Sequence, residues 1–314
     1  MVALRFVVAT LSMGLMSTVC AQNYPEKPIR IITGTAGGGS DIAARILVQG
    51  IPGPLGQPVV VDNRTTLLAI DAVSKAAADG YTVLVLGGGI WITPLLQKTT
   101  WDGARDFAPI SMMAREANMI AVHPSMPIKS VKDLIALAKS WPGELNYGTG
   151  ATGAPSHLGG ELFKSMAGVN LTRVPYKGNT AALIAQIGGE IQLTFGALTE
   201  ALPHTKSGKL RALAVTSLEP SALVPGVPTV AATVPGYESI GLIVIMAPAR
   251  TAGAIITRLN QEVVRYIRQP SVKDLFLTAG AEVVADSPEQ FAAFIKADVT
   301  KWTKVIKDAG IKIE

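Results

Sequence analysis

The chain has 314 residues, of which 5% are aromatic, and its 28 Lys and Arg against 23 Asp and Glu give a formal net charge of +5. The basic residues are scattered, and no basic run is interleaved with aromatic side chains, so nucleic acid is excluded as the expected partner. The mild positive balance favours anionic solutes instead.

Residues 1–21 have the pattern of a secretory signal peptide. Arg5 is the only charge, an apolar stretch follows it, and Val19-Cys20-Ala21 is a small-residue cleavage site. We expect cleavage before Gln22, which places the mature protein outside the cytoplasm and removes the only cysteine.

A strand, a glycine-rich loop and a helix start follow at 29–41. The apolar strand is expected at 29–33 and the helix at 41–49, with Ser40 or Asp41 as its N-cap. The loop between them is poor in side chains, so a ligand can approach its backbone closely. A helix N-terminus adds free N–H groups and a partial positive charge. This segment therefore predicts an anion site.

Strand and helix patterns alternate along the rest of the chain. We expect strands at 58–62, 81–86, 118–122, 144–148, 171–174, 192–196, 210–216 and 239–247, and helices at 70–78, 131–139, 156–167 and 180–187. The alternation predicts α/β domains with largely parallel sheets. Ser130 and Ser287 are expected helix N-caps.

The end of the chain is expected to be helical, at 252–268, 272–279 and 288–308, with one short strand at 281–284. These helices are predicted to pack back on the first domain. The chain would then leave that domain near His123 and return at 237–244, and two such crossings make a hinge.

A second glycine-rich loop lies at 148–156. Gly148, Gly150 and Gly153 match a dinucleotide fingerprint, but the next strand ends in Pro175 and not in the acid that would bind a ribose. Neither glycine loop carries the Gly-Lys-Ser/Thr ending of a P-loop. Two anion loops far apart in the sequence instead predict a clamp with one jaw on each domain.

Four further residues each leave two interpretations open. His157 could bind a ligand or hold its own loop. Asn63 and Arg64 could pair with an anion or orient a turn. Trp91 follows three glycines and could line a cleft at the strand ends or close the core.

Catalytic and metal chemistry are disfavoured by the sequence. The chain has three histidines, and no cluster with metal-ligand spacing surrounds them. Ser156 and His157 are adjacent, which does not suit a nucleophile and its base. We therefore expect no enzyme activity, no metal and no cofactor.

Several longer motifs occur in order along the mature chain. They include Leu55-Gly56-Gln57-Pro58-Val59-Val60-Val61, Asp106-Phe107-Ala108-Pro109-Ile110, His157-Leu158-x-Gly160-Glu161-Leu162-Phe163 and Gly208-Lys209-Leu210-Arg211-Ala212-Leu213. Together these motifs resemble the Bug-type receptors, the extracytoplasmic solute receptors of tripartite tricarboxylate transporters.

The resemblance implies a two-domain periplasmic-binding fold, type II-like, in which each domain is a mainly parallel sheet flanked by helices. Residues 22–122 and 239–314 would form domain 1 and residues 123–238 domain 2. It implies a periplasmic receptor that closes about its hinge on a small carboxylate solute and delivers it to an integral membrane permease. We expect a monomer.

The expected ligand-binding residues come from the two glycine loops and from two further strand ends. They are Thr35, Ala36, Gly37, Gly38, Ser40, Gly150, Ala151, Thr152, Ser156 and His157, together with Trp91 and Gly196.

The chain departs from the family pattern near these residues. Thr35 and Ala36 replace the usual proline pair, and the loop after Arg64 is shortened. Gly196 stands where many relatives carry an aspartate that could hold a ligand amine, and its absence weakens the expectation of an amino-acid solute.

An apolar solute body is expected from Leu67, Leu68 and Trp91. Two alternatives remain open from the sequence. One is a secreted α/β enzyme that uses His157 and the glycine loops, and the other is a receptor that presents its ligand to a sensor kinase.

Overall fold

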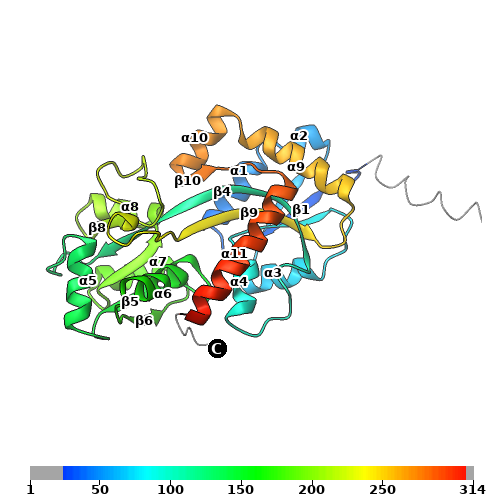
Figure 1. Ribbon diagram of the computed structural model, residues 1–314. Coiled ribbons are helices and arrows are strands. Elements are labelled where there is room, and N and C mark those ends of the chain that lie inside the picture. The colour runs from blue at the N-terminus through cyan, green and yellow to red at the C-terminus, as the bar shows by residue number, and fades with distance from the viewer. Residues whose placement is uncertain (1–23, 309–314) are drawn as a thin grey trace, which may run out of the picture.

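The structure is a computed structural model and describes residues 24–308. The predicted signal peptide, residues 1–21, lies outside these residues. Figure 1 shows two halves, one blue, cyan and orange and the other green, joined by two long strands that run side by side.

The elements follow in chain order. The first half contains β1 (Ile29–Thr33), α1 (Gly39–Leu47), α2 (Pro52–Leu55), β2 (Val59–Asn63), α3 (Thr66–Ser74), β3 (Thr82–Leu86), α4 (Gly89–Ile92) and the 3₁₀ turn η2 (Thr93–Leu95). The strand β4 (Phe107–Val122) leads into the second half. That half contains α5 (Val131–Ser140), β5 (Asn146–Thr149), α6 (Pro155–Ala167), β6 (Thr172–Pro175), α7 (Asn179–Ile187), β7 (Leu193–Ala197), α8 (Leu198–Lys206), β8 (Arg211–Val215) and η3 (Val230–Ala232). The chain returns through β9 (Ile240–Pro248) and ends with α9 (Gly253–Ile267), α10 (Pro270–Thr278), β10 (Ala281–Val283) and α11 (Pro288–Asp308).

The strands form one curled sheet in the order β2-β1-β3-β9-β4-β7-β5-β6, with β8 and β10 both paired to β4. β1 is parallel to β2 and β3, and β5 is parallel to β6 and β7. β9 is antiparallel to β3 and β4, and β4 is antiparallel to β7. Each half therefore has the predicted parallel strands, and the antiparallel strands lie where the halves join.

β4 is much longer than the strand predicted at 118–122. Residues 107–117 pair with β9, and residues 118–122 pair with β7. The register against β9 shifts twice, between Pro109 and Ser111 and between Met112 and Ala114. These irregularities break the two-residue alternation by which a strand is recognised in a sequence, so the first part of β4 gave no strand pattern.

Helices cover both faces of the sheet in each half. In the first half, α1, α9 and α10 pack with Ile31, whereas α3, α4 and α11 pack with the next residue, Ile32. In the second half, α5 and α6 pack with Ile120, and α7 and α8 with Met119. Successive side chains of a strand point to opposite faces of the sheet. This is why Ile31 and Ile32, and likewise Met119 and Ile120, pack against different helices. The C-terminal helices thus pack on the first half, as the sequence predicted.

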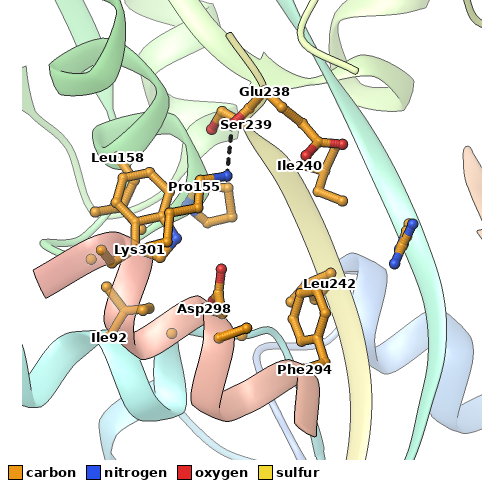
Figure 2. A pocket seen from close by; sticks show the side chains of 16 residues that line it. Ile92, Pro155, Leu158, Glu238, Ser239, Ile240, Leu242, Phe294, Asp298 and Lys301 are labelled. Atoms are coloured by element: carbon orange, nitrogen blue, oxygen red, sulfur yellow. Dashed lines mark hydrogen bonds between the residues drawn. The ribbon is translucent and has the colours of Figure 1, made fainter. Parts of the chain in front are cut away.

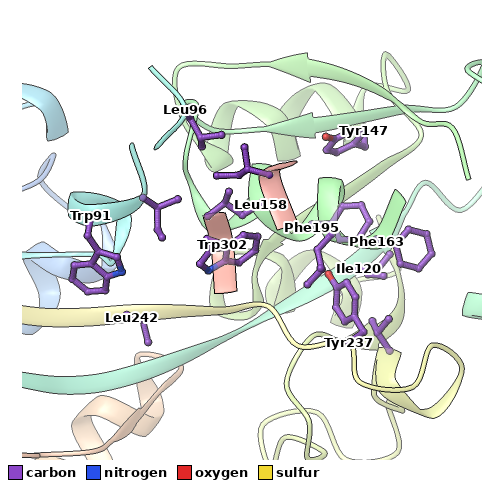
Figure 3. Packing of buried hydrophobic residues seen from close by; sticks show 14 of the residues in the cluster. Trp91, Leu96, Ile120, Tyr147, Leu158, Phe163, Phe195, Tyr237, Leu242 and Trp302 are labelled. Carbon is purple, nitrogen blue, oxygen red and sulfur yellow. The ribbon is translucent and has the colours of Figure 1, made fainter. Parts of the chain in front are cut away.

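One apolar cluster extends from the first half into the second. Figure 3 shows Trp91, Leu242, Trp302 and Leu158 of this cluster. At its far end, Phe195 contacts the rings of Tyr147 and Phe163, with centroids 5.7 and 5.6 Å apart. On the α11 side of the molecule, the apolar cluster therefore has members in both halves.

Helix caps agree with the sequence at two of the three predicted positions. Ser130 accepts from the Asp133 N–H at 3.1 Å, and Ser287 and Gln290 form the reciprocal capping box. The cap predicted for α1 was wrong: the helix begins at Gly39, its N-cap is Gly38, and no side chain caps it. Among the helices of residues 24–308, none is long and apolar enough to span a membrane.

Candidate functional site

Loops from the two halves meet beside the crossing strands β4 and β9. The parallel strands β1, β2 and β3 end at one edge, and β5 and β7 end at an edge of the other half. The loop after β5 reaches the first half, where Gly153 is so close to Thr93 that a Cβ at Gly153 would lie 2.9 Å from the threonine Oγ1. The carboxyl ends of parallel strands are where open α/β sheets place ligands.

The loop after β1 is braced by Asp41. Its carboxylate accepts from the Gly37 N–H at 2.8 Å, from Asn63 Nδ2 at 2.8 Å and from Arg45 Nε at 3.0 Å. Asn63 also donates to Gly34 O at 2.8 Å. The brace leaves residues 35–37 exposed and the first turn of α1 without a side-chain cap. This is the geometry that an anion loop needs.

Hydrogen bonds to the Asp41 carboxylate favour its charged form. Burial raises the pKa of Asp41, but hydrogen bonds from Arg45, Asn63 and the Gly37 N–H outweigh it and hold the pKa below its ordinary value. Asn63 thus orients the loop. Arg64 forms an ion pair with Asp62 at 3.0 Å. Asn63 and Arg64 therefore make contacts within the protein, as in the interpretation in which they orient a turn.

The loop after β5 is held by its own side chains. The Gly150 N–H donates to Ser156 Oγ at 3.0 Å, and the Gly153 N–H donates to His157 Nδ1 at 3.1 Å. Ser156 and His157 are both buried, so His157 supports the loop from within, whereas Ala151 is exposed. α6, which follows, also has no side-chain cap.

Trp91 is in the core. It is 2% exposed, its indole N–H donates to Asp298 Oδ2 at 2.8 Å, and its ring meets Phe291 edge-on. The structure therefore agrees with the interpretation in which Trp91 closes the core. Leu67 and Leu68 are exposed on the first turn of α3.

Gly196 leaves space in β7. A Cβ at this position would have no neighbour nearer than Thr194 Oγ1, at 4.0 Å. A side chain at this position would therefore meet open space.

A cavity of about 360 Å³ lies between the halves (Figure 2). Gly88, Gly89 and Gly153 contribute to it from the loops after β3 and β5. The other lining residues are apolar or polar: Ile92, Pro155, Leu158, Ile240, Leu242, Phe294, Ala297 and Trp302, with Arg115, Glu238, Ser239, Asp298 and Lys301. Lys301 Nζ donates to Glu238 O at 3.4 Å, the dashed line in Figure 2. α11 therefore supplies one wall of the cavity.

Two acids that the sequence analysis did not single out lie by the crossing strands. Glu116 is on β4, opposite Gly241 of β9, and its carboxyl group lies against Gly39 at the start of α1. Glu200 is in the first turn of α8. A charged pair, Arg115 and Glu116, inside an apolar strand was the signal that could have revealed the first of them. Within residues 24–308 no three His, Cys, Asp or Glu side chains are grouped to hold a metal ion.

Comparisons with known proteins give consistent matches over nearly the whole chain. A family model described as "Tripartite tricarboxylate transporter family receptor" matches residues 43–311. Protein BugT of Bordetella pertussis is 33% identical over 309 residues, covering 96% of this chain and 95% of BugT.

Solved structures show the same likeness. A structure titled "R. palustris Rpa4515 with adipate" has a TM-score of 0.84 at 36% identity and covers 92% of this chain and 99% of its own. The periplasmic binding protein BugD has a TM-score of 0.82 at 29% identity, over 92% and 99% of the two chains. MatC of Rhodopseudomonas palustris with bound malate has a TM-score of 0.81 at 25% identity, over 90% and 99%.

Proposed function

The chain belongs to the family of tripartite tricarboxylate transporter receptors, and on that premise we propose that it captures a small carboxylate between its two halves. Proteins of this family are periplasmic solute receptors and not enzymes. The likeness to BugD and to the adipate-bound protein confirms the expected two-domain periplasmic-binding fold and the expected role as a solute receptor.

One observation carries the proposed mode of binding. The glycine loops before α1 and α6 come from different halves, and each leads into a helix without a side-chain cap. The backbone N–H groups of Thr35, Ala36, Ala151 and Thr152 would bind the carboxylate. Those of Gly37, Gly38 and Gly150 donate within the protein, so these three glycines would shape the two loops. Ser40 would add a hydroxyl from the first turn of α1, and Ser156 and His157 would hold the second loop in place. Gly196 would leave room for the solute.

Contacts to the carboxylate alone do not supply the binding free energy of such a site. Micromolar affinity needs roughly 8 kcal/mol. About four backbone hydrogen bonds to a charged group, at roughly 1.5–3 kcal/mol each, give roughly 6–12 kcal/mol. Lost rigid-body freedom removes several kcal/mol of this. Burial of an apolar solute body would supply the remainder.

Closure and delivery complete the proposal. The halves, residues 22–122 with 239–314 and residues 123–238, would rotate about β4 and β9 as the solute binds. Residues 1–21 would direct export to the periplasm, and the closed monomer would present its solute to an integral membrane permease. Trp91 would act indirectly, by fixing α11 behind the cavity.

A carboxylate screen tests this proposal. The mature chain, from Gln22, is heated with mono-, di- and aromatic carboxylates, adipate and malate among them, and a tight ligand raises the melting temperature. Calorimetry then measures the affinity, and recovery of the ligand unchanged separates a receptor from an enzyme.

A loop variant tests the site. Gly38→Val is expected to abolish binding while folding persists, because a side chain here would cover the loop backbone. Gly253→Val, at an open helix start, is the matched control. Unchanged affinity in Gly38→Val would overturn the assignment of the loop.

A further inference from the structure

Asn179, the first residue of α7, lies directly beside the loop after β5. β5 and β6 are parallel neighbours, so the segments that follow them leave the same edge of the sheet. A Cβ at Gly150 would lie 3.1 Å from Asn179 Oδ1 and 3.7 Å from the Asn179 backbone nitrogen. Asn179 is therefore packed against the loop whose next N–H groups, those of Ala151 and Thr152, are proposed to bind the solute carboxylate.

A chain of two hydrogen bonds fixes the orientation of the Asn179 amide. The Gly150 N–H donates to Ser156 Oγ at 3.0 Å, and the Ser156 hydroxyl donates to Asn179 Oδ1 at 2.7 Å. The second distance is the usual length of an O–H···O bond, which places the amide oxygen, and not the amide nitrogen, on the serine. The Nδ2 atom of Asn179 is thus directed away from Ser156.

The N–H donors of this amide nitrogen are not used within the protein. Among residues 24–308, the Asn179 side chain has one hydrogen bond, the one from Ser156, and Nδ2 takes no part in it. The side chain is partly exposed, so Nδ2 can be reached from outside. An amide nitrogen offers two donors, whereas an ionised carboxylate only accepts. The unused part of Asn179 is therefore complementary to a carboxylate.

The charge around Asn179 also favours an anion. Residues 162–189 contain Lys164, Arg173 and Lys177 but no acid. The Arg173 guanidinium lies at the same loop, where its Nη2 donates to Thr152 Oγ1 at 3.1 Å. A cation close to a group of N–H donors stabilises a carboxylate that binds there.

We propose that Asn179 is a solute-binding residue, whose Nδ2 donates to the solute carboxylate at the loop after β5 while Ser156 holds the amide in that orientation. The inference rests on the proposed function, in which the N–H groups of Ala151 and Thr152 bind this carboxylate. Asn179 adds a side-chain donor from α7 to a loop that otherwise binds through its backbone. It thereby selects a solute group that accepts hydrogen bonds and donates none.

Two substitutions separate donation to the solute from acceptance of the Ser156 hydroxyl. Asn179→Asp keeps an oxygen for Ser156 but replaces the donor with a charged acceptor, whereas Asn179→Ala removes both functions. A carboxylate at this position would repel the carboxylate of the solute. We therefore expect Asn179→Asp to weaken binding at least about 100-fold and Asn179→Ala about ten-fold. If Asn179 only held Ser156, Asn179→Asp would bind like the wild type and Asn179→Ala would be the weaker variant.

Calorimetry on the mature chain measures these affinities, with adipate, malate and benzoate as the probes. Asn170→Asp is the matched control, because it makes the same exchange on an exposed residue that precedes β6, and it should change the affinity by less than about two-fold. The loss in Asn179→Asp comes from charge repulsion, so it should shrink as the salt concentration rises, while the loss in Asn179→Ala should not. Urea unfolding verifies that all three variants are folded.

The outcomes distinguish this inference from the proposed function. If Asn179→Asp binds the probes as tightly as the wild type, or no more weakly than Asn179→Ala, the assignment of Asn179 is wrong and the receptor function stands. If no carboxylate binds the folded wild-type chain, the proposed function fails and the inference fails with it.

Discussion

Replacing Asn63 with leucine removes the side chain that ties the loop after β1 to the end of β2. The bond from its Nδ2 to the charged Asp41, at 2.8 Å, is worth roughly 1.5–3 kcal/mol, and the bond to Gly34 O, at 2.8 Å, roughly 0.5–1.5 kcal/mol. The bond it accepts from the exposed Arg45 adds little. We therefore expect Asn63→Leu to lower the free energy of unfolding by about 2–4 kcal/mol.

The loss should depend on pH in a definite direction. The pKa of Asp41 is lower in the folded chain than its ordinary value, so its charge stabilises the fold at neutral pH and ceases to do so as the pH falls through the folded value. Asn63→Leu removes one of the bonds that lower this pKa. The difference between wild type and variant is therefore largest at pH 7 and shrinks as the pH falls below about 4.

Urea unfolding of the mature chain, followed by tryptophan fluorescence, measures both effects. The matched control is Arg64→Leu, which breaks a partly exposed pair with Asp62 and should cost less than about 1 kcal/mol. If Asn63→Leu costs no more than this control, the brace does not hold the loop and the reasoning is refuted.

Two other substitutions probe the packing around the site by the same measurement. Trp91→Phe removes the N–H donor of Asp298, whose pKa burial already raises, so we expect a loss of about 1–3 kcal/mol at pH 7 and a smaller loss at pH 4. Trp101→Phe, which breaks a bond to a backbone carbonyl, should lose stability equally at both pH values, and the same behaviour in Trp91→Phe would contradict the expectation. Gly160→Ala drives a methyl group into the ring of a buried tyrosine and should cost about 1–3 kcal/mol. Gly253→Ala enters open space and should change stability by less than about 0.5 kcal/mol, so equal effects of the two would refute the packing argument.

The sequence predicted those parts of the fold that depend on local pattern. Apolar runs alternating with helical periods gave the parallel strands, and Ser130 and Ser287 gave helix starts. It missed the first part of β4, because Pro109 and the two register shifts interrupt the alternation. It also placed Asp41 as a cap, whereas the carboxylate lies inside the first turn and braces the preceding loop.

The site was predictable only where a short segment defines it. Each glycine loop follows a strand directly, so its place at the edge of a sheet can be read from the sequence. The contact of Glu116 with the start of α1 depends on the register of β4 against β9, which is set by long-range packing. Trp91 stayed ambiguous for the same reason, since its partner Asp298 arrives on the last helix of the chain.

The position of β9 between β3 and β4 determines the order in which this chain can fold. β3 ends at Leu86 and β9 begins at Ile240, so the sheet of the first half stays interrupted until a very long loop has closed. Contacts so distant in sequence form slowly. The second half needs only β4 from outside itself, so it can assemble early and hold β4 extended as a template for β9. The pairing of β3 with β9 is therefore expected to form after the second half and after the local pairing of β1 with β2 and β3.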